Sequence, residues 1–140
     1  MILPRHMRGA MTEQPDTQGL MQAVQRYFDL MYDADMSRFD RVFQPTAQLH
    51  GLRDGQMRML TTQAYRDILA RSPSPKSNRA QRQEEILLLD VTSPDQALAK
   101  VRVRINAMVY VYYLNYHRVD GEWLISSKSF HVESNSAAAS

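Results

Sequence analysis

The side chain best suited to move a proton near neutral pH is His131, near the end of the last strand pattern. Side chains along a strand alternate between the two faces of a sheet. If Trp123 points inward, His131, eight residues later, is therefore predicted to point inward as well. An imidazole there could act as an acid, a base or a hydrogen-bonding group. The alternative is a half-exposed histidine at the fraying end of the strand.

A second candidate is Asp35, which follows the first predicted helix. Its carboxylate could act as a general base if burial raised its pKa toward neutral pH. The alternative is that Asp35 caps the next helix, a common role for aspartate at such junctions. The catalytic residues therefore stay unassigned, with Asp35 and His131 as the candidates.

Tyrosines recur at even positions of one predicted strand, at Tyr110, Tyr112 and Tyr116. Their rings could form the floor of a pocket, with hydroxyls that orient a flat ligand or donate to a developing oxyanion. They could equally form a dimer face, because tyrosine is favoured at interfaces. Tyr27, on the inward stripe of the first helix, serves the core first and a ligand second, and His50 is either a ligand contact or a satisfied histidine of the core or rim. The predicted ligand-binding residues are Tyr27, His50, Tyr65, Tyr112, Tyr116, Trp123 and His131.

Several other kinds of site find no support in the sequence. The chain has no cysteine, and its four histidines show no paired spacing with carboxylates, so neither a metal nor a cofactor is expected. Its arginines are scattered and its net charge is +2, which gives no basic stripe for nucleic acid. No apolar run approaches 18 residues, and the start lacks the apolar core of a secretory signal. We therefore expect no membrane partner and a cytoplasmic location.

Apolar periodicity predicts one α+β domain over residues 17–133. A helix capped by Thr17 runs to about Asp33, a short helix capped by Ser37 ends before Pro45, and a third helix is capped by Thr61 or Thr62. The segment 47–60 reads as a hairpin with an Asp54-Gly55 turn, and four strands follow at about 84–92, 98–107, 109–119 and 122–132, the first of them central. Residues 1–16 are predicted to be a poorly ordered extension and residues 134–140 a disordered tail.

Two local strings strengthen a family resemblance that this element order suggests. The first joins Tyr27-Phe28-Asp29 with Asp33-Ala34-Asp35 and Phe43-Gln44-Pro45-Thr46-Ala47, and the second is Asp120-Gly121-Glu122-Trp123-Leu124-Ile125 followed by Lys128. Together they resemble the NTF2-like superfamily over residues 17–132, and most closely its putative lumazine-binding and SnoaL-like groups. Gln44 and Tyr112 depart from the family pattern, which commonly has His and Asp there.

The resemblance implies a cone in which three N-terminal helices pack in the concave face of a curved, mostly antiparallel mixed sheet. It also places Asp35 near the entrance of the cone. The function expected is binding of a small, largely apolar or aromatic molecule in the cone cavity by a protein that forms a homodimer through its sheet. One alternative is an isomerase, cyclase or dehydratase that uses acid and base residues in the same cavity, with SnoaL-like or ketosteroid-isomerase-like proton transfer. Another is an interaction module that recruits a protein through the outer face of the sheet.

Overall fold

The computed structural model of the chain describes residues 16–135. The described chain is α+β, with a six-stranded sheet in the order β2-β1-β6-β5-β4-β3. All neighbouring strands are antiparallel except β1 and β6, which are parallel. The elements are α2 (Thr17–Asp33), the 3-10 helix η1 (Met36–Arg41), β1 (Phe43–Arg53), β2 (Gln56–Thr61), α3 (Thr62–Arg71), β3 (Glu84–Ser93), β4 (Gln96–Ile105), β5 (Met108–Val119) and β6 (Glu122–Asn135).

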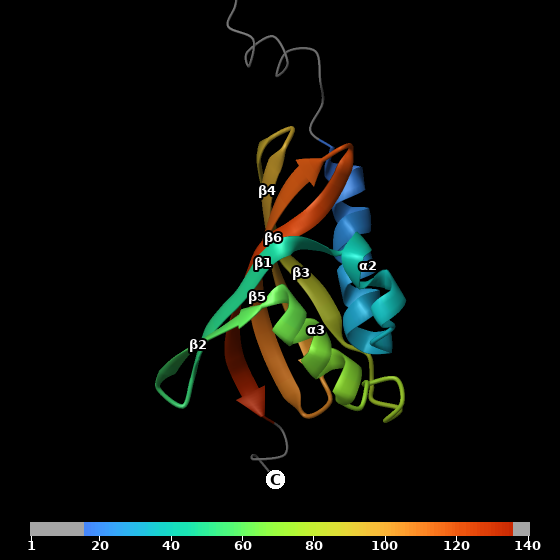
Figure 1. Ribbon diagram of the computed structural model, residues 1–140, viewed down its shortest axis with the longest axis vertical. Coiled ribbons are helices and arrows are strands. Elements are labelled where there is room, and N and C mark those ends of the chain that lie inside the picture. The colour runs from blue at the N-terminus through green and yellow to red at the C-terminus, as the bar shows by residue number, and fades with distance from the viewer. Residues whose placement is uncertain (1–15, 136–140) are drawn as a thin grey trace, which may run out of the picture.

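The sheet curves, and α2 and α3 cover the same concave face (Figure 1). Helix α2 buries the apolar stripe that the periodicity predicts, including Leu20, Val24 and Tyr27. Its cap is Asp16, whose side chain accepts a hydrogen bond from the Gly19 backbone, so the prediction of Thr17 as the cap was wrong by one residue. The predicted extension 1–16 and tail 134–140 otherwise fall almost entirely outside the described residues.

The expectation of three N-terminal helices is only partly met. The second is a six-residue 3-10 helix, and its cap is Asp35 rather than Ser37, because the Asp35 carboxylate accepts from the Ser37 backbone. Helix α3 comes only after the first hairpin, and Thr61 caps it by accepting from the Ala64 backbone. One of the two caps proposed for the third helix is thus confirmed.

The hairpin of β1 and β2 has the register that the predicted two-residue turn at Asp54-Gly55 gives, with Leu52 opposite Met57 and His50 opposite Met59. Asp54 and Gly55 both have positive φ, as a two-residue turn of the predicted kind requires. The position of β3 differs from the prediction, because β3 lies at the edge of the sheet and not in its centre. The apolar run 86–89 of β3 is continuous because Leu87 and Leu88 are apolar although they are partly exposed on the outer face, at 36% and 50%.

A β-bulge in β6 decides which side chains of this strand face the helices. Asn115 pairs with Ser127 while Tyr116 pairs with Ile125, so Ser126 is one residue too many on its strand. Trp123 and Ile125 before the bulge are buried. Beyond the bulge the inward positions are even-numbered, beginning with Lys128, and His131 is exposed on the outer face. The prediction that His131 shares the face of Trp123 was therefore wrong.

Candidate functional site

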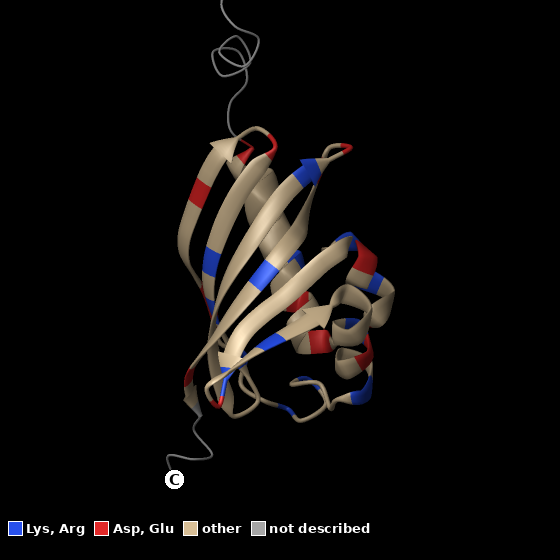
Figure 2. Cartoon of the chain, turned by 60° about the vertical axis from the view of Figure 1, so that its left-hand side comes forward, with Lys and Arg blue, Asp and Glu red and all other residues tan. Residues whose placement is uncertain are grey.

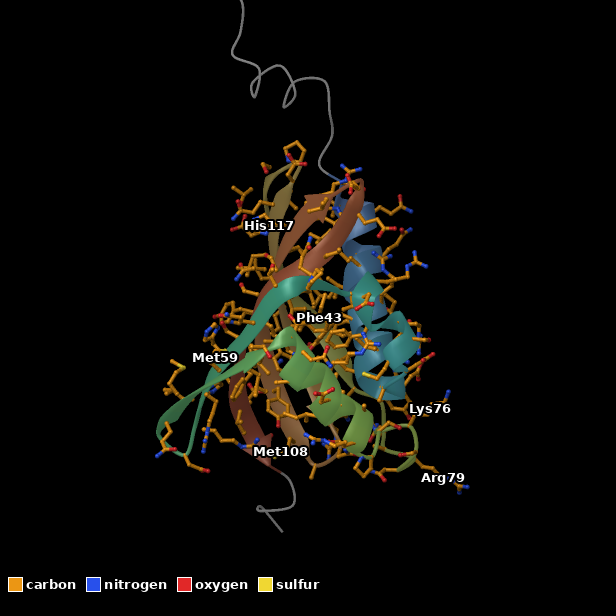
Figure 3. The ribbon with its side chains drawn as sticks, in the orientation of Figure 1. Phe43, Met59, Lys76, Arg79, Met108 and His117 are labelled. Carbon is orange, nitrogen blue, oxygen red and sulfur yellow. The ribbon has the colours of Figure 1, made fainter. Side chains whose placement is uncertain are left out.

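A cavity of about 780 Å³ lies between the helices and the concave face of the sheet. The last turn of α2, α3 and the proline-containing loop after it form one side, and β1, β2, β5 and β6 form the other. In Figure 3 the labelled Met108, which lines the cavity, lies at the start of β5, and Phe43 lies between the helices and the sheet. The size is that of a pocket for a small organic molecule.

Aromatic rings form much of the floor of the cavity. The rings of Tyr110 and Tyr112 are stacked at 5.3 Å, and Phe130 meets Tyr110 edge to face at 6.4 Å. Gly51 lies under the Phe130 ring, where an added Cβ would approach a ring carbon to 2.4 Å. A glycine at this position lets the ring lie directly over β1.

The charged residues that line the cavity, within the described part of the chain, are Arg53 and Arg58. Both belong to the hairpin, and they share its concave face with Leu49 and Leu60. No aspartate, glutamate or histidine is among the described lining residues. The cavity therefore combines an apolar interior with positive charge.

Behind the cavity wall, Lys128 is buried in a cage of aromatic rings, with 1% of its surface exposed. Its Nζ donates a hydrogen bond to the Tyr65 hydroxyl at 2.8 Å. The same nitrogen lies 3.9 Å from the ring centroid of Tyr112, 4.7 Å from those of Tyr27 and Tyr65, and 5.9 Å from that of Phe43. Tyr65 and Tyr112 are thus shared between the cage and the cavity wall.

Burial lowers the pKa of Lys128 well below its usual value, because a charged ammonium loses its hydration there. The four ring faces favour the charged form and oppose this in part. No carboxylate pairs with Lys128 among residues 16–135, so the loss of hydration prevails. Burial also raises the pKa of Tyr65, which keeps its hydroxyl protonated.

The Tyr65 hydroxyl takes part in two hydrogen bonds. It accepts from Lys128 and its own proton is directed at the sulfur of Met31, at 3.4 Å. A thioether is a weak acceptor, so an oxygen atom of a bound molecule would be a better partner for this proton. The pair can donate one hydrogen bond into the cavity or, if the amine is neutral, take up a proton.

The structure brings together some of the predicted ligand-binding residues. Tyr65 and Tyr112 line the cavity, and Tyr27 lies behind them in the cage around Lys128. Tyr116 and Trp123 are buried but do not line the cavity, and the Trp123 indole donates to Asp16 at 3.1 Å. The roles of all five in ligand binding stay predictions.

The remaining candidates lie away from the cavity. His50 is half-buried and His131 exposed, both on the outer face of the sheet. Asp35 is exposed, and the hydrogen bonds from Ser37, followed by the Arg38 charge, lower the pKa of its carboxyl. That direction is opposite to the one a general base near neutral pH needs.

Sequence reasoning missed Lys128 and the two arginines of the cavity. Lys128 is part of the string that carried the family resemblance, but strict alternation placed it on the outer face. Arg53 and Arg58 could have been found, because the correctly predicted hairpin register puts them on the face of Leu49 and Leu60.

The fold belongs to the NTF2-like class. An NTF2-like protein of unknown function from Shewanella baltica OS155 superimposes with a TM-score of 0.76 at 18% identity, over 86% of this chain and 95% of that chain. One from Silicibacter pomeroyi DSS-3 gives 0.72 at 20% identity, over 84% and 96%. A ketosteroid isomerase-like protein from Erwinia carotovora atroseptica SCRI1043 gives 0.63 at 12% identity, over 81% and 93%.

The model of the putative lumazine-binding family matches residues 15–131. The chain belongs to this family, as the two sequence strings indicated. A comparison with curated proteins found no match. Among residues 16–135, no helix is both long and apolar enough to cross a membrane.

Proposed function

We propose that the protein binds a small, largely apolar or aromatic molecule in the cavity beneath α3. The observation that carries this proposal is the cavity itself, about 780 Å³ in volume with a floor of stacked tyrosines and Phe130. Pockets of this size with apolar and aromatic walls and few polar groups are the usual sites for small organic ligands. The family description, which names a small aromatic molecule, is consistent with it.

In this proposal the Tyr65 hydroxyl fixes the orientation of the ligand from the inner wall. Among residues 16–135 its proton has the Met31 sulfur as its one partner, so a ligand oxygen gains a hydrogen bond at little cost to the protein. Lys128 holds the hydroxyl in place from behind. An oxygen atom at the inner end of a flat ligand therefore has a hydrogen-bond donor available.

A second candidate function is proton transfer by an isomerase, cyclase or dehydratase. The observation that favours it is the Lys128 and Tyr65 pair, in which burial shifts both pKa values and a hydrogen bond joins the groups. Asp35 and His131 face solvent, so turnover would depend on this pair instead. Tyr65 would then donate to the developing oxyanion of the substrate.

We also propose that the outer face of the β1–β2 hairpin pairs with a second copy of the chain. Leu52, Met57 and Met59 are adjacent there and are 60%, 66% and 51% exposed. Figure 3 shows Met59 at the outer side of the hairpin, away from the helices. Beyond the hairpin, acidic and basic residues are interspersed over the molecule (Figure 2). An apolar cluster within such a surface is typical of a protein interface.

Isothermal titration with the neutral aromatic probe 2-naphthamide tests ligand binding. The variant Met108→Trp places a large ring at the mouth of the cavity and should abolish binding, because Met108 lines the cavity. Met21→Trp is the matched control, since Met21 is exposed on α2 and does not line the cavity. Binding that survives in Met108→Trp, or no binding of either the amide or its acid by the wild type, would contradict the proposal.

A further inference from the structure

At the tip of the β1–β2 hairpin, apolar side chains lie on the outer face and charged side chains lie on the concave face, the reverse of the usual arrangement in a sheet that covers a core. Toward the tip, its outer face carries Leu52 and Met57, which are exposed. Its concave face, which lines the cavity, carries Arg53 and Arg58. Arg53 and Arg58 are both exposed at the edge of this apolar cavity, where their positive charge is available to a bound molecule.

The two arginines are close neighbours in the hairpin ladder. Gly51 pairs with Arg58, and Arg53 is two residues further along the strand of Gly51, so Arg53 and Arg58 are diagonal neighbours on one face. Such positions are about 7–8 Å apart, within reach of long side chains. Neither arginine makes an ion pair or a side-chain hydrogen bond among the described residues.

Several other arginines of the described chain have acidic partners. Arg102 on the outer face contacts Glu85 and Glu133, and Arg38 contacts Asp33 at 2.6 Å. At the mouth of the cavity no described lining residue is acidic. Arg53 and Arg58 therefore have no acidic partner among the described lining residues, so an anion that binds in the cavity could pair with both.

We propose that the ligand of this cavity is an aromatic carboxylate, whose acid group lies between Arg53 and Arg58 while its ring lies over Phe130. This inference rests on the proposed binding function and adds the chemical class of the ligand. The planar guanidinium matches a carboxylate with two parallel hydrogen bonds, which a lysine cannot provide. Gly51 supports the geometry, because the Phe130 ring lies over it and Arg58 is its partner on the other side in the ladder.

The test compares two probes of the same shape, 2-naphthoate and 2-naphthamide, by isothermal titration. The wild type should bind the acid about tenfold to a hundredfold more tightly than the amide, the range expected for hydrogen bonds to a charged group. The double variant Arg53→Gln and Arg58→Gln should lose that preference and keep the affinity for the amide. Arg71→Gln, on α3 and outside the cavity lining, is the matched control and should bind as the wild type does.

The outcomes separate the two proposals. If the wild type binds the amide as tightly as the acid, the inference about charge fails while the binding function stands. If it binds neither, the binding function fails and the inference fails with it. If Arg71→Gln weakens acid binding as much as the double variant does, general electrostatic attraction explains the preference, and the assignment to Arg53 and Arg58 is wrong. Thermal melting of each variant verifies that it is folded.

Discussion

Lys128 and Tyr65, which are 63 residues apart in the chain, meet in the core with 2.8 Å between Nζ and the hydroxyl oxygen. Apart from this bond, the surroundings of Nζ are aromatic faces. A methionine has nearly the same length and would fill the space without the loss of hydration. We therefore expect Lys128 to lower the stability of the fold, which is common where a side chain has a functional role.

The first prediction is that Lys128→Met makes the protein more stable. Replacing buried ionisable groups by apolar ones of similar volume is often neutral or stabilising, by about 1–4 kcal/mol in the case of buried ion pairs. Urea denaturation at pH 7 measures the difference. The control is Lys76→Met, because Lys76 is exposed and should change the free energy of unfolding by less than about 0.5 kcal/mol.

The pH dependence of stability should change in the same variant. The folded-state pKa of Lys128 is depressed below the unfolded value of 10.5, so between these two values the unfolded chain binds more protons than the folded one. Stability of the wild type gains from this group as pH rises through that window, and the gain ends above 10.5. Lys128→Met should lack this contribution while Lys76→Met keeps it. Identical slopes in all three proteins would show that Lys128 keeps its charge in the folded state.

The second prediction concerns the coupling between Tyr65 and Lys128. Tyr65→Phe removes the acceptor of Lys128 and leaves a buried amine unsatisfied, at a cost of about 1–3 kcal/mol. In the Lys128→Met background the same change should cost much less, so the double-mutant cycle should give a coupling energy of about 0.5–3 kcal/mol. Tyr113→Phe, on the outer face of the sheet, should be additive with Lys128→Met. Additivity of Tyr65→Phe with Lys128→Met would mean that the hydrogen bond contributes nothing.

Much of the fold could be predicted from the sequence because the signals are local. Apolar periodicity indicates the inward stripe of α2. Turn residues with positive φ determine the register of the β1–β2 and β5–β6 hairpins where the strands meet the turns. The inward tyrosines of β5 follow from simple alternation, and the structure places Tyr112 and Tyr116 in the interior rather than on a dimer face.

The candidate site was harder to predict because one inserted residue changes the outcome. The bulge at Ser126 exchanges the faces of β6, so that Lys128 turns inward and His131 outward. Serine is not a residue type that indicates a bulge, so the sequence alone predicts that the alternation of side chains continues past Ser126. The edge position of β3 was missed for a related reason, because strand order depends on long-range pairing that no local pattern encodes.

The third prediction tests the proposed homodimer. The double variant Met57→Lys and Met59→Lys puts two charges into the exposed apolar cluster and should convert a dimer into a monomer. Sedimentation velocity of the wild type and the variant measures the change. Met21→Lys replaces an equally exposed methionine on α2 and should leave the dimer intact. A wild type that sediments as a monomer would contradict the proposal directly.

The fourth prediction concerns the contact of Gly51 with Phe130. Gly51→Ala places a methyl group 2.4 Å from the ring, so the ring must move, and the cavity that it lines lies next to it. We expect a destabilisation of about 1–3 kcal/mol, typical of an overpacked site, together with weaker binding of 2-naphthoate. Thermal melting and isothermal titration measure the two effects.

The double variant Gly51→Ala and Phe130→Ala provides the control for that experiment. Without the ring there is no steric conflict, and alanine in a strand interior is then favoured over glycine by about 0.5–1 kcal/mol. Gly51→Ala should therefore be destabilising in the wild type and stabilising in the Phe130→Ala background. The same sign in both backgrounds would mean that Gly51 is required for the path of β1 itself and not for the position of the ring.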